Sequence, residues 1–154
     1  MGNVSCRGFN AQAGASFLTV HAEACPHLHR VVHQIKELGV KAGVAINPGT
    51  PLAAVEEVLP YLDMVLVMTV NPGFPAQAFI EEMLDKVSRL RSMLDERGSG
   101  IELEVDGGIN ATTAPAAVKA GARVLVAGSS IYSGNSSVSQ AIKRLRDSLS
   151  GLDL

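Results

Sequence analysis

This chain of 154 residues contains no tryptophan, and aromatic residues make up only 4% of it. We therefore do not expect the protein to bind bases or sugar rings by stacking them on aromatic side chains. No apolar run reaches the ~18 residues of a membrane-spanning helix, and Met1–Gln12 lacks the apolar segment of a secretory signal. The formal net charge is −2, with neither a basic stripe nor an acidic tail, so we expect no nucleic-acid and no membrane partner.

Cysteine is scarce as well. Cys6 and Cys25 are the only two, and they do not have the CxxC spacing of a zinc site or a redox motif. We expect both thiols to be reduced and the protein to be cytoplasmic, with an incidental disulfide as the alternative.

The remaining composition is that of an ordinary globular domain. Hydrophobic residues make up 47% of the chain and charged residues 18%, and the length suffices for one sizeable core. Residues 1–12 show neither a strand nor a helix pattern, so we predict an irregular N-terminal segment there. Residues 13–154 show no break in composition and are predicted to form one domain.

Five apolar segments rich in β-branched residues alternate with amphipathic segments. The predicted strands are residues 17–20, 42–46, 64–70, 101–105 and 124–127. Between them apolar residues recur with helical spacing, as at positions 28, 31, 32, 35 and 38 before Gly39. One helix between successive strands, with strand starts roughly 20 to 40 residues apart, is typical of βαβ units. We therefore predict an α/β fold with a parallel sheet.

Capping residues predict where two of the helices begin. Thr50-Pro51 offers a cap followed by a proline at the first helical position. Another helix is predicted to be capped near Asn110 or Thr112 and to end at Gly121. Two more helices are predicted to bury one face each, made of Phe79, Met83, Val87, Leu90 and Leu94, and of Val138, Ile142, Leu145 and Leu149.

Residues capable of chemistry follow three of the predicted strands. His21 follows the first, Asp106 and Gly107-Gly108 the fourth, and Gly128-Ser129-Ser130 the fifth. Because the carboxyl ends of parallel strands meet at the ligand-binding edge, we expect these residues to converge. An imidazole and a carboxylate suit a divalent metal such as zinc, iron or manganese, although a closed site takes four ligands. Each also has a plainer interpretation, as a packed histidine and as an Asx turn or cap.

The two glycine turns predict a phosphate site. Glycines at these positions let backbone N–H groups approach an anion, and the turns after the last two strands are where (β/α)₈ barrels recurrently bind phosphate. The alternative is that the glycines only make tight turns. The turn Asn71-Pro72-Gly73-Phe74 after the third predicted strand could hinge a lid over a substrate, although such turns are common.

Three histidines and two methionines are not expected to act in a site. His27, His29 and His33 stand at positions i, i+2 and i+6, so we do not expect them to share a helical face or to bind a metal. Met64 and Met68 are interpreted as core residues. Met68 is expected to point to the same edge of the sheet as His21, at the carboxyl ends of the strands.

Five segments resemble one enzyme family. They are residues 19–24 (TVHAEA), 41–51 (KAGVAINPGTP), 67–74 (VMTVNPGF), 104–109 (EVDGGI) and 126–131 (VAGSSI). On these residues, matched from about Ala13 to the last helix, the chain resembles the ribulose-phosphate 3-epimerases. MTVNPGF and EVDGG, in this order and at this spacing, are highly specific. Family members are (β/α)₈ TIM barrels of the ribulose-phosphate-binding type, and the chain resembles their strands four to eight. The resemblance thus implies an incomplete barrel of about five βα units.

The resemblance also implies a reaction. The family are isomerases of the pentose phosphate pathway that interconvert D-ribulose 5-phosphate and D-xylulose 5-phosphate. One carboxylate removes the C3 proton, a second on the opposite face returns one, and a divalent metal (Zn, Fe, Mn or Co) stabilises the enediolate. By position, His21 resembles a metal ligand at the substrate, and Asp106 resembles a metal ligand and one acid/base. Gly107, Gly108, Gly128 and Ser129 match the phosphate site, and Gly73, Phe74, Pro75 and Ala76 match the mobile loop.

Parts of the family pattern have no counterpart here. These are the strand-two segment, with a metal-binding histidine and the second acid/base aspartate, and the first-strand serine that contacts substrate. Pro75 and Ala76 stand where the mobile loop usually has two glycines, and proline lacks an N–H for phosphate. A fragment, a shortened reading frame and a degenerate paralogue all agree with this pattern.

Two other functions therefore stay open. One is a non-catalytic sugar-phosphate-binding fragment or half-barrel, because proton transfer on two faces needs two acid/bases. The other is a related ketose-phosphate epimerase, such as one acting on allulose 6-phosphate. In each case the expected partner is a small sugar phosphate. The open first and last strands of a barrel arc further predict a homo-oligomer.

Overall fold

The computed structural model describes residues 10–74, 77–134 and 136–152. Its elements are, in order, β1 (Phe17–His21), η1 (Ala22–Ala24), α2 (Leu28–Glu37), β2 (Lys41–Ile46), α3 (Ala53–Glu56), η2 (Leu59–Tyr61), β3 (Met64–Met68), α4 (Met83–Glu96), β4 (Glu102–Asp106), α5 (Ala114–Lys119), β5 (Val124–Val126), α6 (Ser129–Tyr132) and α7 (Val138–Asp147). The predicted alternation of strands and helices is confirmed.

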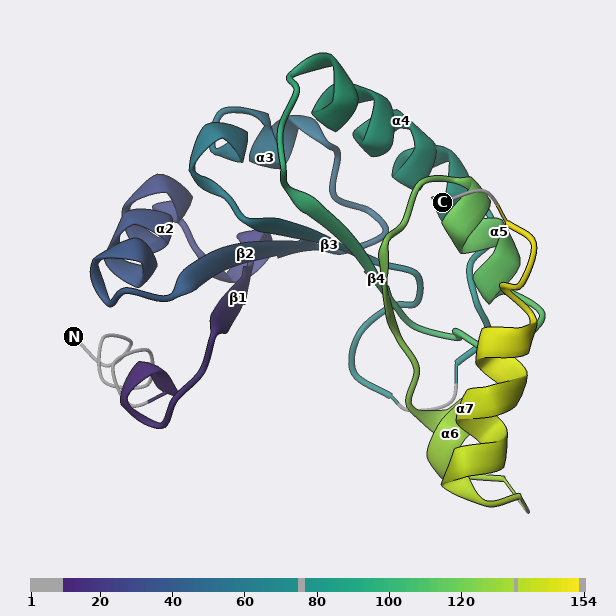
Figure 1. The fold of residues 1–154 in the computed structure, drawn as a ribbon. Helices are drawn as coiled ribbons and strands as arrows, with labels where there is room; N and C mark the ends of the chain where they lie inside the picture. The colour runs from purple at the N-terminus through teal and green to yellow at the C-terminus, as the bar shows by residue number, and fades with distance from the viewer. Residues whose placement is uncertain (1–9, 75–76, 135, 153–154) are drawn as a thin grey trace.

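The strands form one parallel sheet in the order β1-β2-β3-β4-β5. Each strand pairs with the next along the chain, which requires a crossover after every strand. Figure 1 shows a curved sheet with α2, α3, α4 and α5 along its outer side. This is the architecture of part of a (β/α)₈ barrel, as predicted. Within the described residues the arc stays open, with β1 and β5 as its edges.

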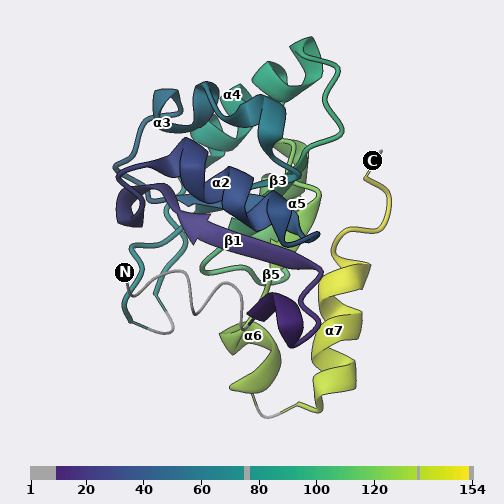
Figure 2. The ribbon, with the colours of Figure 1, turned by 90° about the vertical axis from the view of Figure 1, so that its left-hand side faces the viewer.

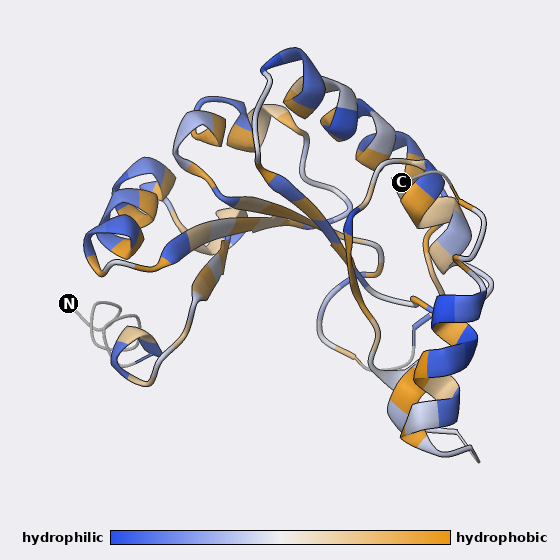
Figure 3. Ribbon diagram, viewed as in Figure 1, coloured by the Kyte–Doolittle hydropathy of each residue, from blue (hydrophilic) through white to orange (hydrophobic). Residues whose placement is uncertain are grey.

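The core lies between the sheet and the helices. On the outer face of the sheet the fully buried side chains include Val44, Val65, Val67, Leu103 and Val105, which pack with Val32 and Ile35 of α2 and with Val87, Leu90 and Leu94 of α4. The ribbons of α2, α4 and α7 alternate between hydrophilic and hydrophobic residues, as amphipathic helices do (Figure 3). The opposite, inner face is more exposed and carries His21, Leu66, Glu104 and Asp106.

Neither predicted cap lies at the N-cap of its helix, although Asn110 makes a hydrogen-bonded turn just before α5, whose N-cap Thr113 has no side-chain cap. Asn110 Oδ1 accepts hydrogen bonds from the backbone N–H of Thr112 at 2.8 Å and of Thr113 at 3.1 Å, next to the start of α5. Thr50 caps nothing, because α3 begins at Ala53 without a side-chain cap. Its hydroxyl donates to the Glu23 carboxylate instead. Thr50 thus binds a residue distant in the sequence instead of the backbone at the start of the next helix.

The ends of the chain differ in part from the prediction. Residues 10–12 are helical, while residues 1–9, which include Cys6, lie outside the described part. Leu145 of α7 and Leu149 just beyond it pack against the core as predicted, but Val138 and Ile142 of α7 are exposed. Figure 2 shows α7 beside α6, and Figure 1 shows α7 on the side of the sheet far from β1. None of the helices in the described ranges has the length and apolarity to cross a bilayer.

Candidate active site

Asp106 ends β4 on the inner face of the sheet, in register with Met68 of β3. The residue is half-buried, and burial raises the pKa of its carboxyl group. An aspartate that holds its proton more readily than an exposed one can serve as a general acid or base closer to neutral pH.

A second carboxylate, Glu104, lies on the same face two residues earlier. Its pKa is raised, first by burial and second by the negative charge of Asp106. The period of two along β4 puts both side chains on the inner face. That period was visible in the sequence, but Glu104 was not considered because it precedes the strand end, and it does not line the cavity beside Asp106.

Gly107 and Gly108 form the turn after β4, with positive φ angles of 122° and 67°. Neither has room for a side chain, because a Cβ would lie 2.5 Å from Val70 Cγ2 at Gly107 and 2.6 Å from the Phe79 backbone nitrogen at Gly108. The plainer interpretation, a tight turn, is therefore part of their role. Within the described residues neither amide N–H donates a hydrogen bond, so both can serve an anion.

The second glycine turn differs from the first. A Cβ at Gly128 would meet nothing within 4 Å, so this glycine borders open space. Gly128 directly precedes α6, and among the described residues its amide and that of Ser129 donate no hydrogen bond. Ser130 Oγ donates to the carbonyl of Ile109 at 2.7 Å and ties the two turns together.

These groups border one cavity of about 390 Å³. Its lining consists of Met68, Val70, Pro72, Gly73, Phe74, Asp106, Gly107, Gly108, Ile109, Val126, Gly128 and Ser129. The structure thus brings Asp106 and both glycine turns together, as their positions at strand ends led us to expect. Sequence reasoning missed the apolar part of the lining, including Val70, Ile109 and Val126, because nothing in an apolar residue type separates cavity wall from core.

His21 ends β1 and does not line this cavity. Its Nδ1 lies 3.4 Å from the carboxylate of Glu23. Glu23 in turn accepts the backbone N–H of Asn47 at 2.8 Å and the hydroxyl of Thr50. Burial alone would raise the pKa of Glu23, but these hydrogen bonds outweigh it and lower the pKa. His21 therefore lies beside a carboxylate whose ionised form is stabilised by hydrogen bonds.

His21 and Asp106 are carried by strands that are not neighbours, since β2 and β3 lie between β1 and β4. A shared ion would require both side chains to reach inward over these two strands. Among the described residues no group of three or more His, Cys, Asp or Glu could hold a metal. The two predicted ligands therefore do not make a complete metal site within the part of the chain that is described.

The turn after β3 also borders the cavity. Gly73 and Phe74 line it, and Phe74 is 81% exposed. Gln77 Nε2 donates to the carbonyl of Phe74 at 2.9 Å and to that of Asn71, which closes the base of the turn. The predicted loop residues Pro75 and Ala76 lie outside the described residues.

Sequence reasoning also missed Lys86, a buried lysine of α4. Its Nζ donates to the carbonyls of Asn47 at 3.2 Å, Pro48 at 2.6 Å and Thr50 at 2.8 Å. Burial is the main cause that lowers its pKa. The loop after β2 is thus held by hydrogen bonds to both Glu23 and Lys86. A lone lysine in an amphipathic helix gives no sequence signal for such a contact.

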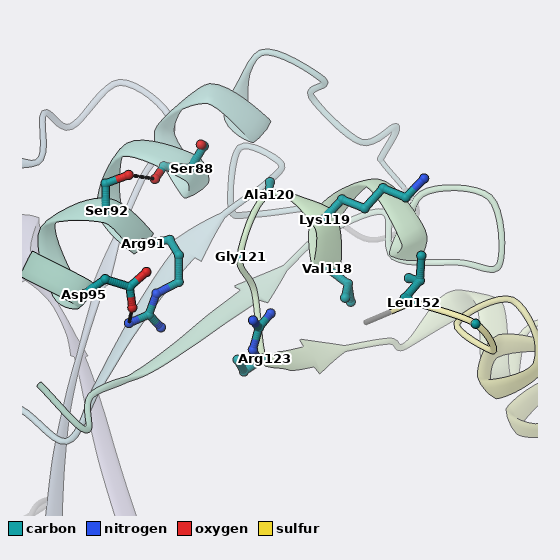
Figure 4. Close-up of a pocket in the computed structure, with 11 residues that line it drawn as sticks. Ser88, Arg91, Ser92, Asp95, Val118, Lys119, Ala120, Gly121, Arg123 and Leu152 are labelled. Carbon is teal, nitrogen blue, oxygen red and sulfur yellow. Dashed lines mark hydrogen bonds and ion pairs between the residues drawn. The ribbon is translucent and has the colours of Figure 1, made fainter. Parts of the chain in front are cut away.

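A larger cavity, of about 760 Å³, lies elsewhere, between α4 and α5 at the N-terminal end of β5 (Figure 4). Arg91 and Asp95, paired at 2.6 Å, line it together with Lys119 and Arg123. The smaller cavity at the carboxyl ends of the strands holds the inner-face carboxylate and the glycine turns, so we place the candidate active site there.

Comparison with known proteins identifies relatives along most of the chain. The family model described as "Ribulose-phosphate 3 epimerase family" matches residues 7–132. The ribulose-phosphate 3-epimerase of Bacillus subtilis (strain 168) is 54% identical over 139 residues, which are 90% of this chain and 64% of that protein. That of Treponema pallidum (strain Nichols) is 54% identical over 123 residues, 80% of this chain and 56% of that protein. The chain therefore spans 64% and 56% of the lengths of these two relatives.

A solved structure supports the fold. The crystal structure of 3-hexulose-6-phosphate synthase superimposes with a TM-score of 0.71 at 23% identity, over 97% of this chain and 70% of that one. At this identity the likeness concerns the fold alone, and it agrees with an incomplete (β/α)₈ barrel.

Proposed function

Because this chain belongs to the ribulose-phosphate 3-epimerase family, we propose that it acts on D-ribulose 5-phosphate and D-xylulose 5-phosphate in the pentose phosphate pathway. The observation that supports this most directly is the cavity of about 390 Å³ that joins Asp106 to both glycine turns. A base and an anion site on one cavity suit a small sugar phosphate with an acidic C–H bond.

Asp106 is the proposed acid/base. The C3 hydrogen of the ketose is acidified by the neighbouring C2 carbonyl, and the Asp106 carboxylate would remove it to give an enediolate. A raised pKa makes this carboxylate a stronger base than an exposed aspartate. When the proton returns from Asp106 to the same face, the starting epimer is regenerated.

The glycine turns are the proposed phosphate site. The amides of Gly107, Gly108, Gly128 and Ser129 would donate to the phosphate oxygens, as backbone N–H groups do at phosphate sites after the last strands of a barrel. The loop of Gly73, Phe74, Pro75 and Ala76 is the proposed cover over the bound sugar. Proline at position 75 has no N–H, so we expect weaker phosphate contacts from this loop.

Members of this family use a divalent metal. We propose Zn, Fe, Mn or Co, with His21 and Asp106 as ligands; when bound, the ion would supply charge for the enediolate oxygens. The described residues do not complete its coordination shell. The chemistry proposed for Asp106 is therefore proton transfer alone.

A second candidate function is non-catalytic binding of a sugar phosphate. The observation that favours it is that Asp106 is the only carboxylate among the described residues lining the cavity. Inversion at C3 needs a second acid/base on the opposite face. A related ketose-phosphate epimerase, such as one acting on allulose 6-phosphate, is the remaining alternative.

We also propose a cytoplasmic homo-oligomer. The edges of β1 and β5 present unpaired backbone groups in the described sheet, and such edges favour association between chains.

Deuterium exchange tests the function without requiring inversion. Each pentulose 5-phosphate is incubated with the full chain and a divalent metal in D₂O, and proton NMR follows C3. We expect one epimer to gain deuterium slowly, and Asp106→Asn to abolish the gain. Net epimerisation should be about 10²–10⁴-fold below that of an intact relative, because one acid/base is missing. Binding without exchange would establish the non-catalytic alternative, and tighter binding of allulose 6-phosphate would establish the other epimerase. No binding of any sugar phosphate would refute all three.

A further inference from the structure

We propose that α2 carries a second metal site, formed by His29 and His33, that takes a divalent transition metal such as Zn²⁺, Ni²⁺ or Cu²⁺. The two residues are four apart on a helix and are both exposed. The expectation that His27, His29 and His33 share no helical face is right for the three together and wrong for this pair. The proposal does not depend on the function proposed for the cavity.

The geometry of the pair carries the proposal. The two Nε2 atoms are 3.1 Å apart, whereas the ring centroids are 4.3 Å apart. The rings therefore converge at their Nε2 ends, the atoms that bind metals in most two-histidine helical motifs. In the metal-free protein one Nε2 donates its proton to the other, and a metal would take the place of that proton.

The Nε2 separation also fits the coordination geometry. Zinc–imidazole bonds of about 2.05 Å to both nitrogens, 3.1 Å apart, give an angle of about 98° at the metal. This lies between the about 90° of square-planar sites and the about 109° of tetrahedral ones.

Tyr61 of η2 holds the pair in place. Its ring centroid is 5.1 Å from that of His29, edge-on, and 4.8 Å from that of His33. Packing against a ring from another element limits the rotamers of both imidazoles, which lowers the entropy lost on binding. Lys36, one turn beyond His33, is paired with Asp63 at 2.7 Å, so its charge is balanced.

The ligand set predicts which ions bind. No third His, Cys, Asp or Glu of the described residues completes a group with these two, so water would fill the other positions. Two imidazoles with open positions suit Cu²⁺, Ni²⁺ and Zn²⁺ and disfavour Mg²⁺ and Ca²⁺. Such a site exchanges its metal readily, unlike a closed structural zinc site.

Titration of Zn²⁺ and of Ni²⁺ into the full chain tests the site. We would use a His21→Ala background, which removes the other histidine predicted to bind metal. Calorimetry should then show one ion per chain. His29→Ala or His33→Ala should weaken binding by about ten-fold or more, because the second imidazole binds at a high effective concentration. His27→Ala, which removes an exposed histidine outside the pair, is the matched control and should leave the affinity unchanged.

Two further measurements keep the result interpretable. Alanine has a higher helix propensity than histidine, so circular dichroism should show these variants folded, and His33→Gln repeats the test with a polar side chain. Electron paramagnetic resonance of bound Cu²⁺ should show two nitrogen ligands, falling to one in either pair variant. Unchanged affinity in the pair variants, or equal loss in His27→Ala, would overturn the proposal.

Discussion

Replacing Gly108 by alanine should destabilise the fold strongly, because this glycine meets two separate constraints. Its φ of 67° costs an alanine roughly 1–2 kcal/mol. The new Cβ would also lie 2.6 Å from the Phe79 backbone nitrogen and 2.8 Å from its Cα, and backbone cannot move aside as a flexible side chain can. Overpacking of this kind costs about 1–3 kcal/mol. Together they predict a loss of about 2–5 kcal/mol in the free energy of unfolding.

Thermal unfolding measures this loss. A domain of this size changes its Tm by about 2–4 °C per kcal/mol, so Gly108→Ala should lower the Tm by about 4–20 °C. Gly128→Ala is the matched control, because a Cβ there meets nothing within 4 Å, and we expect a change within about 0.5 kcal/mol. Both variants must be compared at one protein concentration, since association shifts the Tm. A Gly108→Ala protein as stable as the unmodified chain would refute the reasoning from close approach.

Three further predictions concern the rim. Gly128→Leu should abolish binding of sulfate or a sugar phosphate while the Tm stays nearly unchanged. His21→Ala should keep phosphate binding and weaken metal binding. If titration showed that Gly128→Leu weakens metal binding and His21→Ala abolishes phosphate binding, the assignments of the phosphate site and the metal site would be wrong. Because burial raises the folded-state pKa of Asp106, its protonated form stabilises the fold at low pH, and that stability is lost as pH rises through the raised pKa. Asp106→Asn should therefore be more stable than the unmodified chain at neutral pH. In urea titrations the difference should vanish below pH 3.8, the ordinary pKa of an aspartate, and a pH-independent difference would contradict this. Lys86→Met should leave three loop carbonyls without their donor and cost about 1–3 kcal/mol, and an unchanged midpoint of urea unfolding would show that water replaces the amine.

Much of the fold could be predicted from the sequence because it depends on local patterns. The apolar, β-branched run from Met64 predicted a strand buried by helices, and the apolar spacing from Leu28 predicted the helix face that packs on the sheet. Asn110 makes its hydrogen-bonded turn just before α5, close to where a cap was predicted, because its partners, the next backbone amides, are local. Such interactions need no knowledge of the tertiary structure.

The contacts that could not be predicted join residues far apart in the chain. Thr50 reads as a helix cap, yet its hydroxyl binds Glu23, 27 residues away. Lys86 gave no signal in the sequence, yet it is buried and donates to carbonyls 36 to 39 residues earlier. The placement of Asp106 among the glycine turns followed from the rule for parallel strands, whereas the distance of His21 from that cavity depends on which strands lie between them.

The side-chain hydrogen bonds along the rim connect neighbouring units in turn. Glu23 and Lys86 both bind the loop after β2, Thr69 Oγ1 donates to the carbonyl of Gly107 at 2.6 Å, and Ser130 Oγ donates to the carbonyl of Ile109. A unit that opens therefore releases a partner on its neighbour. The rates of amide hydrogen exchange in these turns should therefore change together along the arc. A chimera in which one βα unit is replaced by that of a distant barrel would also need matching rim residues in the neighbouring units to unfold cooperatively.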